Sequence, residues 1–242
     1  MKYLAAAAGA LLCVATPILA DDAVALPAPL EAALERSVAE GSDADWRFLL
    51  TYTNSESQVV ARFDGSRPIE QRWTPVSPAE AEMSEAERAI WDEITGEGDN
   101  DGEDGDGGLF FDAQDALFIP GTLVAAGERD GIVAYNFRPH FDPDDAEEAA
   151  FAAHLHGEIA IAGAPAGVRR VRLWVPESFK PNVAVRINEF ELEQEFSEID
   201  DLPAPVMTRM TQRLSGSAAF QRFEESFELE FSQIEYLAMP SR

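Results

Sequence analysis

The stretch VAVRINEFELEQEF, residues 183–196, decides the fold. Val183, Val185 and Ile187 alternate with other residues, and the apolar phase then moves to Phe190. A period of two is typical of a strand with one apolar face. At roughly 3.3 Å per residue this strand would extend for about 45 Å, whereas an average strand has about five or six residues. A sheet built from strands of this length is expected to twist and coil.

The last strand of the chain repeats this pattern. In residues 220–236, Phe227, Leu229 and Phe231 alternate, and the phase then moves to Ile234. Such a slip turns the apolar face outward unless a β-bulge restores it. Slips in two long strands therefore predict bulges that bend the sheet into a half-open barrel.

Charged residues on these strands predict their order. Glutamates occupy the polar face of the first long strand, arginines follow in residues 206–214, and glutamates return in the last strand. The residues concerned are Glu189, Glu191, Glu193, Glu195, Arg209, Arg213, Glu228 and Glu230. Opposite charges across neighbouring strands contribute about 0.2–1 kcal/mol each. The order predicts an antiparallel meander with the arginine strand in the middle, and it assigns the arginines to sheet pairing rather than to an anion site.

Shorter runs rich in β-branched and aromatic residues predict further strands. They cover residues 46–52, 57–63, 72–74, 131–139, 153–162 and 168–175. The glycine-bounded segment 163–167 predicts a tight hairpin between its flanking strands. A second turn is expected at Ser215-Gly216-Ser217, before the last strand.

Helix signals are concentrated in the first half of the chain. Residues 27–38 carry an apolar residue at every fourth position, which predicts an amphipathic helix. The run SPAE at residues 77–80 has the features of a helix start, and Ser84 with Glu87 repeats them. A short helix is also predicted within residues 110–118.

Residues 1–20 have the features of a secretory signal peptide. Lys2 precedes an apolar run at residues 4–14, and Ala20 ends the segment before two aspartates. The run is too short to span a bilayer, which takes about 20 residues. We expect cleavage after Ala20, a periplasmic location and a single domain over residues 21–242. The alternative, lipidation at the single cysteine, lacks the small preceding residue that the motif requires.

The composition is strongly acidic, with 45 acidic and 18 basic residues and a net charge of −27. This charge argues against binding nucleic acid or anionic lipid headgroups. It is compatible with a basic protein partner, although a solubilising surface is the simpler explanation. Residues 96–108 contain almost only Gly, Asp, Glu and Asn and are expected to form a disordered acidic loop. The loop does not fit the EF-hand pattern, which favours a solvated linker over a calcium site.

The chain was searched for residues that could perform chemistry. His154, His156 and Glu158 would share one face of a strand and are the best candidates for metal ligands. The apolar residues that alternate with them point to the core, so a solvent-facing strand is the interpretation we favour. Ser215 lies outside any nucleophile-elbow pattern, and no glycine-rich phosphate loop precedes a helix. The sequence therefore predicts no enzyme, no metal and no cofactor.

The order of elements resembles a known family. A helix near the N-terminus, strands, an inserted helical segment and a long-stranded meander are similar to the LolA/LolB lipoprotein-carrier fold and to the sensor domain of envelope-stress regulators. The run ARFDGSRP at residues 61–68, followed by Arg72 and Trp73, also resembles the opening of exported bacterial proteins without assigned function. The resemblance covers most of residues 25–237. It implies an α+β fold, in which one strongly curved antiparallel sheet of about seven to nine strands carries helices on its concave face.

This expected hollow suggests a class of ligand. Helices that cover the apolar face of a curved sheet loosely would leave room for an acyl chain. We therefore expect a non-enzymatic periplasmic binding protein that holds a lipid or an acylated-protein segment. The expected ligand-binding residues are Val183, Val185, Ile187, Phe227, Leu229 and Phe231, and ordinary core packing is the competing interpretation of each. A protein–protein interaction or envelope-stress-sensing module with an acidic surface is the second hypothesis, and a hydrolase with an unrecognised site is the third.

Overall fold

The computed structural model describes residues 26–38, 46–95, 109, 118–119, 121–140, 146–200, 202, 204–219 and 221–237. The predicted signal peptide and the acidic segment 96–108 lie outside the described residues, as does most of the helix predicted within residues 110–118. The strands are β1 (Trp46–Asn54), β2 (Gln58–Asp64), β3 (Trp73–Ser77), β4 (Val124–Arg129), β5 (Ile132–Phe137), β6 (His156–Ala162), β7 (Gly167–Trp174), β8 (Val185–Ser197), β9 (Val206–Ala218) and β10 (Gln221–Tyr236). The helices are α2 (Ala28–Val38), α3 (Glu85–Thr95) and α4 (Ala146–Ala152), and short 3₁₀ turns lie at Ile69–Gln71 and Glu80–Glu82.

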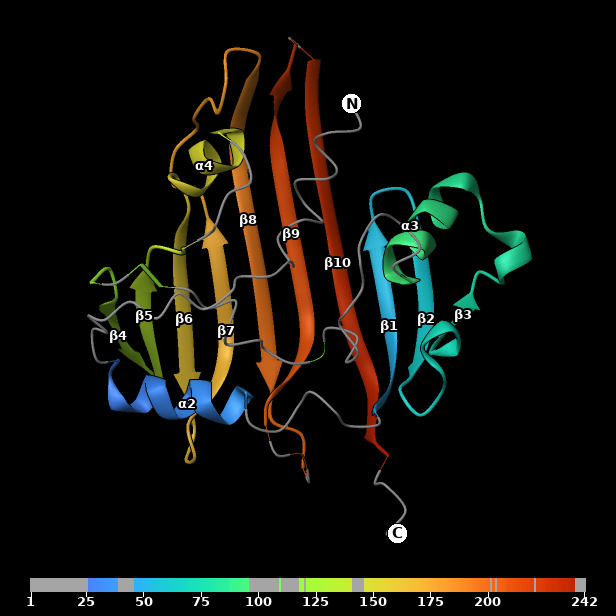
Figure 1. Ribbon diagram of the computed structural model, residues 1–242, viewed down its shortest axis with the longest axis horizontal. Coiled ribbons are helices and arrows are strands. Elements are labelled where there is room, and N and C mark those ends of the chain that lie inside the picture. The colour runs from blue at the N-terminus through green and yellow to red at the C-terminus, as the bar shows by residue number, and fades with distance from the viewer. Residues whose placement is uncertain are drawn as a thin grey trace.

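All ten strands belong to one open antiparallel sheet (Figure 1). Their order is β3-β2-β1-β10-β9-β8-β7-β6-β5-β4. The first strand therefore lies beside the last, and the predicted meander of β8, β9 and β10 forms the centre of the sheet with β9 in its middle. Ten strands exceed the expected seven to nine, in part because every residue of β4 is exposed and the strand shows no apolar alternation.

The structure corrects two predicted boundaries. Ser77 does not start a helix but ends β3, where it pairs with Val60. The second helix signal is confirmed: the Ser84 N–H donates to Glu87 Oε2 at 2.7 Å, and the Glu87 N–H donates to Ser84 Oγ at 3.3 Å. This reciprocal pair is a capping box in front of α3.

The turn predicted at residues 215–217 is also wrong, because β9 continues to Ala218. Gly216 pairs with Ile187 on one side and with Phe223 on the other. A Cβ atom on Gly216 would lie 2.2 Å from the Arg186 carbonyl oxygen and 2.5 Å from Phe223 Cζ. Glycine is required here by close packing inside a strand, not by a turn.

Both predicted bulges are confirmed. In β8, Ile187 and Glu189 pair with the consecutive residues Gly216 and Ser215, so Asn188 is the extra residue. In β10, the register with β1 shifts between Ser232 and Glu235, and Gln233 adopts a positive φ of 52°. Each bulge lies where the apolar phase of the sequence changes.

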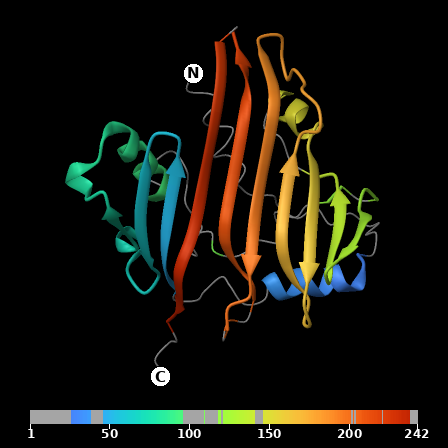
Figure 2. The same cartoon turned by 180° about the vertical axis from the view of Figure 1, so that it is seen from behind.

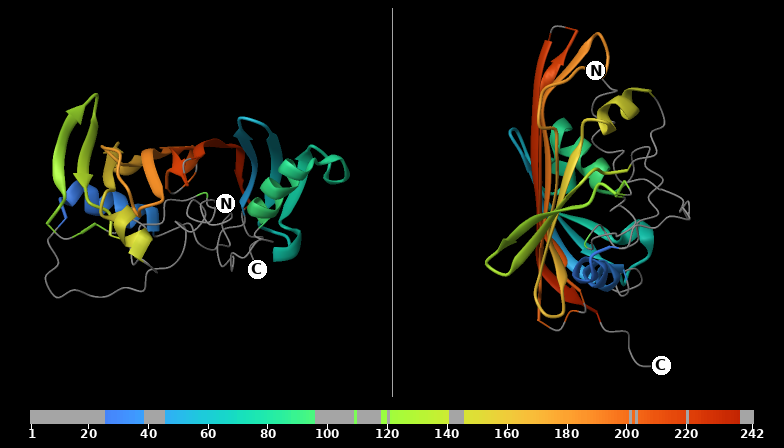
Figure 3. Two further views of the ribbon diagram at one scale, coloured as in Figure 1. Left: turned by 90° about the horizontal axis from the view of Figure 1, so that it is seen from above. Right: turned by 90° about the vertical axis from the view of Figure 1, so that its left-hand side faces the viewer.

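The sheet has two different faces. Figure 3 shows α2, α3 and α4 on one side, which we call the helix-bearing face. Figure 2 shows the opposite side, the bare face, over which no described helix lies. None of the helices in the described ranges is long and apolar enough to cross a bilayer.

Buried side chains on the helix-bearing face form three clusters. The main cluster joins Leu30 of α2 to Phe48 of β1, Ile159 of β6 and Phe231 of β10, and it includes Leu109. A second cluster packs Phe151 of α4 near Leu155, Phe179, Ile187 and Phe190. In the third, Ile90 and Trp91 of α3 pack on Val59 and Ala61 of β2. The helices are thus fixed at separate places on one sheet.

Candidate functional site

Two rows of paired residues cross the centre of the helix-bearing face. The first row consists of Tyr52, Leu229, Met210, Gln194 and Val171, on β1, β10, β9, β8 and β7. The second row consists of Asn54, Phe227, Gln212, Leu192 and Leu173 on the same strands. Residues paired directly across antiparallel strands lie on the same face. We call these ten residues the central rows.

Most apolar side chains of the central rows are half-buried. Tyr52, Phe227, Leu229, Met210, Leu192 and Leu173 all retain some exposed surface. The Phe227 and Tyr52 rings stack with their centroids 5.4 Å apart. Gln212 is a buried polar exception with 5% of its surface exposed, and Gln194 Nε2 lies 3.8 Å from Met210 Sδ. The rows therefore combine accessible apolar groups with two side-chain amides.

The Tyr52 side chain is partly shielded from water by its neighbours on this face. Burial raises the pKa of its phenol to about 12, and the negative charge of Glu93 on α3 acts in the same direction. A raised phenol pKa means that the folded protein favours the neutral side chain. The phenol of Tyr52 is thus partly desolvated and lies near the carboxylate of Glu93 on α3.

The structure separates the six predicted ligand-binding residues. Phe227 and Leu229 belong to the central rows, whereas Phe231 is buried in the main cluster. Ile187 is buried in the second cluster, with Val185 packed against it. Leu229 also packs against the main cluster, so the three residues of β10 are continuous with one another, whereas Val185 and Ile187 belong to a different cluster.

Val183 requires a correction, because it is fully exposed and β8 begins only at Val185. Asn182 Oδ1 accepts hydrogen bonds from the N–H groups of Ala184 and Val185 at 2.8 Å each. This turn ends the extended pattern before Val183 can join the sheet.

Sequence reasoning missed Tyr52, Met210, Leu192 and Leu173 as partners of Phe227 and Leu229. Each lies in a predicted strand, so alternation already placed it on one face or the other. Only the cross-strand register shows which residues stand in the same row.

The bare face carries the predicted charge pairs. Arg209 Nε donates to Glu228 Oε1 at 2.6 Å, and Arg209 Nη1 lies 3.9 Å from Glu195 Oε1. The hydrogen bond from Arg209 lowers the pKa of Glu228. Arg209 thus bridges the strands on either side, as predicted.

The prediction for Arg213 is only half fulfilled. It lies opposite Glu191 in register but forms no ion pair with another described residue. Glu191 instead accepts a hydrogen bond from Arg172 Nε of β7 at 2.6 Å. The next strand along the sheet therefore competes for the same carboxylate.

Only two of the three candidate metal ligands, His156 and Glu158, share a strand face. His154 lies in the turn before β6 and stacks on Phe179, with ring centroids 4.1 Å apart. His156 begins β6, where burial and then the positive charge of Arg138 lower its pKa. Glu158 Oε1 accepts a hydrogen bond from Arg170 Nη2 at 2.7 Å. The described residues contain no group of three or more side chains placed to hold a metal ion.

Comparison of the chain with models of protein families, with curated proteins and with solved structures found no match.

Proposed function

We propose that this is a non-enzymatic periplasmic protein that binds a lipid or an acylated-protein segment along the central rows. The observation that carries the proposal is the set of half-buried apolar side chains there, on the same face as the helices. In this proposal the sheet is strongly curved and its concave face is the helix-bearing one, as in the LolA/LolB-like carriers that the sequence resembles.

The arrangement of the helices supports a ligand that lies across the strands. α2 packs against β6 and β7, and α3 packs against β2. Both helices therefore lie toward the ends of the central rows, and none of the described helices lies over the middle of β9 and β10 (Figure 1). Five strands at about 4.8 Å spacing give the rows a length of about 19 Å. Each CH₂ group of an acyl chain buried there contributes about 0.8 kcal/mol.

The cellular location in this proposal comes from the sequence. The predicted signal peptide at residues 1–20 would deliver the protein to the periplasm, where acylated proteins and lipids pass between membranes. A protein with a net charge of −27 is repelled by anionic lipid headgroups, so recognition would be directed at the apolar part of the ligand.

Native mass spectrometry of protein purified from the periplasm, followed by lipid extraction, tests the proposal. We expect a bound acyl species with the wild-type chain and its loss with Leu229→Arg, which places a charge in the first central row. Val183→Arg is the matched control, since it makes a similar change at a position that the structure places in solvent.

Thermal melting of both variants shows whether they remain folded. If Leu229→Arg unfolds the protein, Met210→Gln provides a milder change in the same row. A wild-type protein that carries no acyl species, and that takes up no fluorescent fatty acid when one is added, rules out the carrier function. If Val183→Arg loses the acyl species to the same extent, the ligand does not bind along the central rows.

A second candidate function is a protein–protein interaction or stress-sensing module, and the bare face favours it. Glu189 and Glu193 on β8 form no ion pair with another described residue. Alternate residues of a strand repeat at about 6.6 Å, so Glu189 and Glu193 are two repeats, about 13 Å, apart. In an extended peptide with lysine at every second position, lysines four positions apart would match these two carboxylates.

Calorimetric titration with a peptide of alternating lysine and threonine tests this second function. Binding should weaken with added salt and with the double change Glu189→Gln and Glu193→Gln. The control removes two exposed carboxylates from α2, by Glu31→Gln and Glu35→Gln, and should leave the affinity unchanged. If both double variants lose the same affinity for the peptide, binding depends on the overall net charge and not on these two carboxylates.

A further inference from the structure

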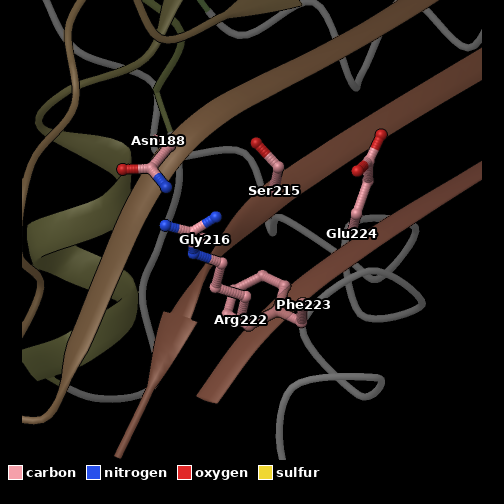
Figure 4. A pocket seen from close by; sticks show the side chains of 6 residues that line it. All are labelled: Asn188, Ser215, Gly216, Arg222, Phe223 and Glu224. Carbon is pink, nitrogen blue, oxygen red and sulfur yellow. The ribbon is translucent and has the colours of Figure 1, made fainter. Parts of the chain in front are cut away.

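A hollow of about 400 Å³ opens at the β8 bulge (Figure 4). Its lining residues are Asn188, Ser215, Gly216, Arg222, Phe223 and Glu224. They come from the three adjacent strands β8, β9 and β10 of the central meander.

Two features of the backbone create this hollow. Asn188 is the extra residue of the β8 bulge, so it departs from the regular alternation of its strand. Gly216 has no side chain to fill the space between the Arg186 carbonyl and the Phe223 ring. The site therefore exists because of the bulge and the glycine together.

Two arginines flank the hollow on one cross-strand row. Arg186 of β8 and Arg222 of β10 both pair with Ser217 of β9 and so lie on the same face. Neither forms an ion pair with another described residue, and the hydrogen bond of Arg186 goes to Ser178 Oγ at 3.3 Å.

The side chains in the hollow are arranged around these cations. Figure 4 shows Asn188 and Arg222 facing each other above Gly216, with the Ser215 hydroxyl beside them. The Glu224 carboxylate points away from the guanidinium group. One side of the hollow thus offers an amide, a hydroxyl and a guanidinium as donors, and the other side offers an acceptor.

We propose that this hollow binds a small molecule with one anionic group, a phosphate or a carboxylate, and a neighbouring hydroxyl. Arg222 donates charge-assisted hydrogen bonds to the anion, and Asn188 and Ser215 complete its shell. Arg186, on the other side of Ser217, attracts the anion at longer range. Glu224 accepts from the hydroxyl. Glu189 and Glu224 both pair with Ser215 in the next row, so a second anionic group elsewhere on the ligand would be repelled. The site is independent of the central rows.

NMR titration of the full chain at constant ionic strength tests this site. The probes are inorganic phosphate, acetate and glycerol 3-phosphate, with sodium chloride as the reference. We expect saturable shifts at residues 186–188, 215–219 and 221–224, at least tenfold weaker binding in Arg222→Gln, and a smaller loss of affinity in Arg186→Gln. Arg213→Gln is the matched control, because it removes the same charge from the same face two rows away.

The hydroxyl contact is tested separately. Glycerol 3-phosphate should bind more tightly than inorganic phosphate. Glu224→Gln should abolish this difference in affinity, and it should strengthen the binding of inorganic phosphate. Thermal melting confirms that each variant is folded. Chemical shifts that do not saturate would overturn the proposed site. An equal loss of affinity in Arg213→Gln and Arg222→Gln would also overturn it, because binding would then depend only on the general surface charge.

Discussion

Glu198 links helix α2 to the sheet through one carboxylate. Its two oxygens accept hydrogen bonds from Arg36 Nη1 and Nη2 at 2.7 and 2.9 Å, and Oε1 also accepts one from Arg169 Nη2 of β7 at 3.0 Å. The hydrogen bond from Arg36 is the largest cause that holds the pKa of Glu198 below its usual 4.5, and the charges of both arginines add to it. Local sequence signals give no hint of this contact, because Arg36 and Glu198 lie 162 positions apart.

We predict that Glu198→Gln lowers the free energy of unfolding by about 1 kcal/mol at neutral pH. This value is the upper end for partly exposed pairs, and it is justified by the bidentate geometry. Because the folded state lowers the pKa, the contribution is present above pH 4.5 and is lost as the pH falls through the lower folded value. Chemical denaturation at neutral and acid pH measures the difference between the two proteins.

Glu193→Gln serves as the control for this measurement. Glu193 lies on β8 without an ion pair to another described residue, and its replacement should change the free energy of unfolding by less than about 0.5 kcal/mol. A loss in Glu198→Gln that stays the same at acid pH would contradict an ionic origin.

Tyr52 gives a second prediction at the scale of one residue. Its pKa is raised from 10.0 to about 12, so the folded protein should lose stability as the pH rises through this interval. Phenolate absorbance followed against pH should show one late ionisation that Tyr52→Phe removes. Tyr236→Phe, at an exposed tyrosine of β10, should leave the late step in place. A late step that survives in Tyr52→Phe would show that the phenol at this end of the central rows is not desolvated.

At the scale of one element, the bulges determine which residues of the long strands face the helices. Without the extra residue in β10, Ile234 and Tyr236 would move to the opposite face. The bulge is made by Gln233 in the left-handed region, with φ of 52°. This conformation costs a residue with a side chain about 1–2 kcal/mol relative to its normal conformation.

We predict that Gln233→Gly raises the free energy of unfolding by about 0.5–1 kcal/mol, since glycine adopts a positive φ without a clash. Ser232→Gly, one position earlier in the regular strand, should have the opposite effect and lower it by about 0.5–1 kcal/mol. Thermal or urea denaturation of the two variants measures both changes. Destabilisation by both glycines would show that the Gln233 side chain, rather than its backbone conformation, matters at the bulge.

At the scale of the whole molecule, the topology makes the N-terminal strands depend on the C-terminal one. β1 forms hydrogen-bonded pairs only with β2 and β10 in the sheet, so β1, β2 and β3 reach the remaining strands through β10. Contacts between residues so distant in sequence close late during folding, and sheets of this kind fold in about milliseconds to seconds.

We predict that a shortened chain ending at Ala218, which lacks β10, cannot hold β1, β2 and β3 on the sheet. Removing β10 exposes Phe48 and Leu50, which are buried against it. Limited proteolysis should then cleave between residues 46 and 77, and the near-ultraviolet signal of the tryptophans should collapse. A chain ending at Leu237 shortens the protein while keeping β10, and should resist cleavage. Protection of residues 46–77 in the shorter chain would contradict the role of β10.

The sequence alone determined the local features of this protein. Alternation and β-prone composition identified all the strands except β4. Changes of phase between Ile187 and Phe190 and between Phe231 and Ile234 located both bulges. The capping box at Ser84 and the order of charges from β8 to β10 were also readable. These signals involve residues close in the chain or on consecutive strands, where spacing alone decides which groups can meet.

The tertiary structure decided everything that depends on distant partners. It placed β1 beside β10, packed Phe223 against Gly216 so that an expected turn became a strand, and left Val183 in solvent. It also joined Tyr52 to Leu229 and Met210 in one row, and placed Arg186 and Arg222 on either side of Ser217. Alternation tells which face of a strand a residue occupies, but the neighbour on that face is set by the register of the whole sheet, which no single segment encodes.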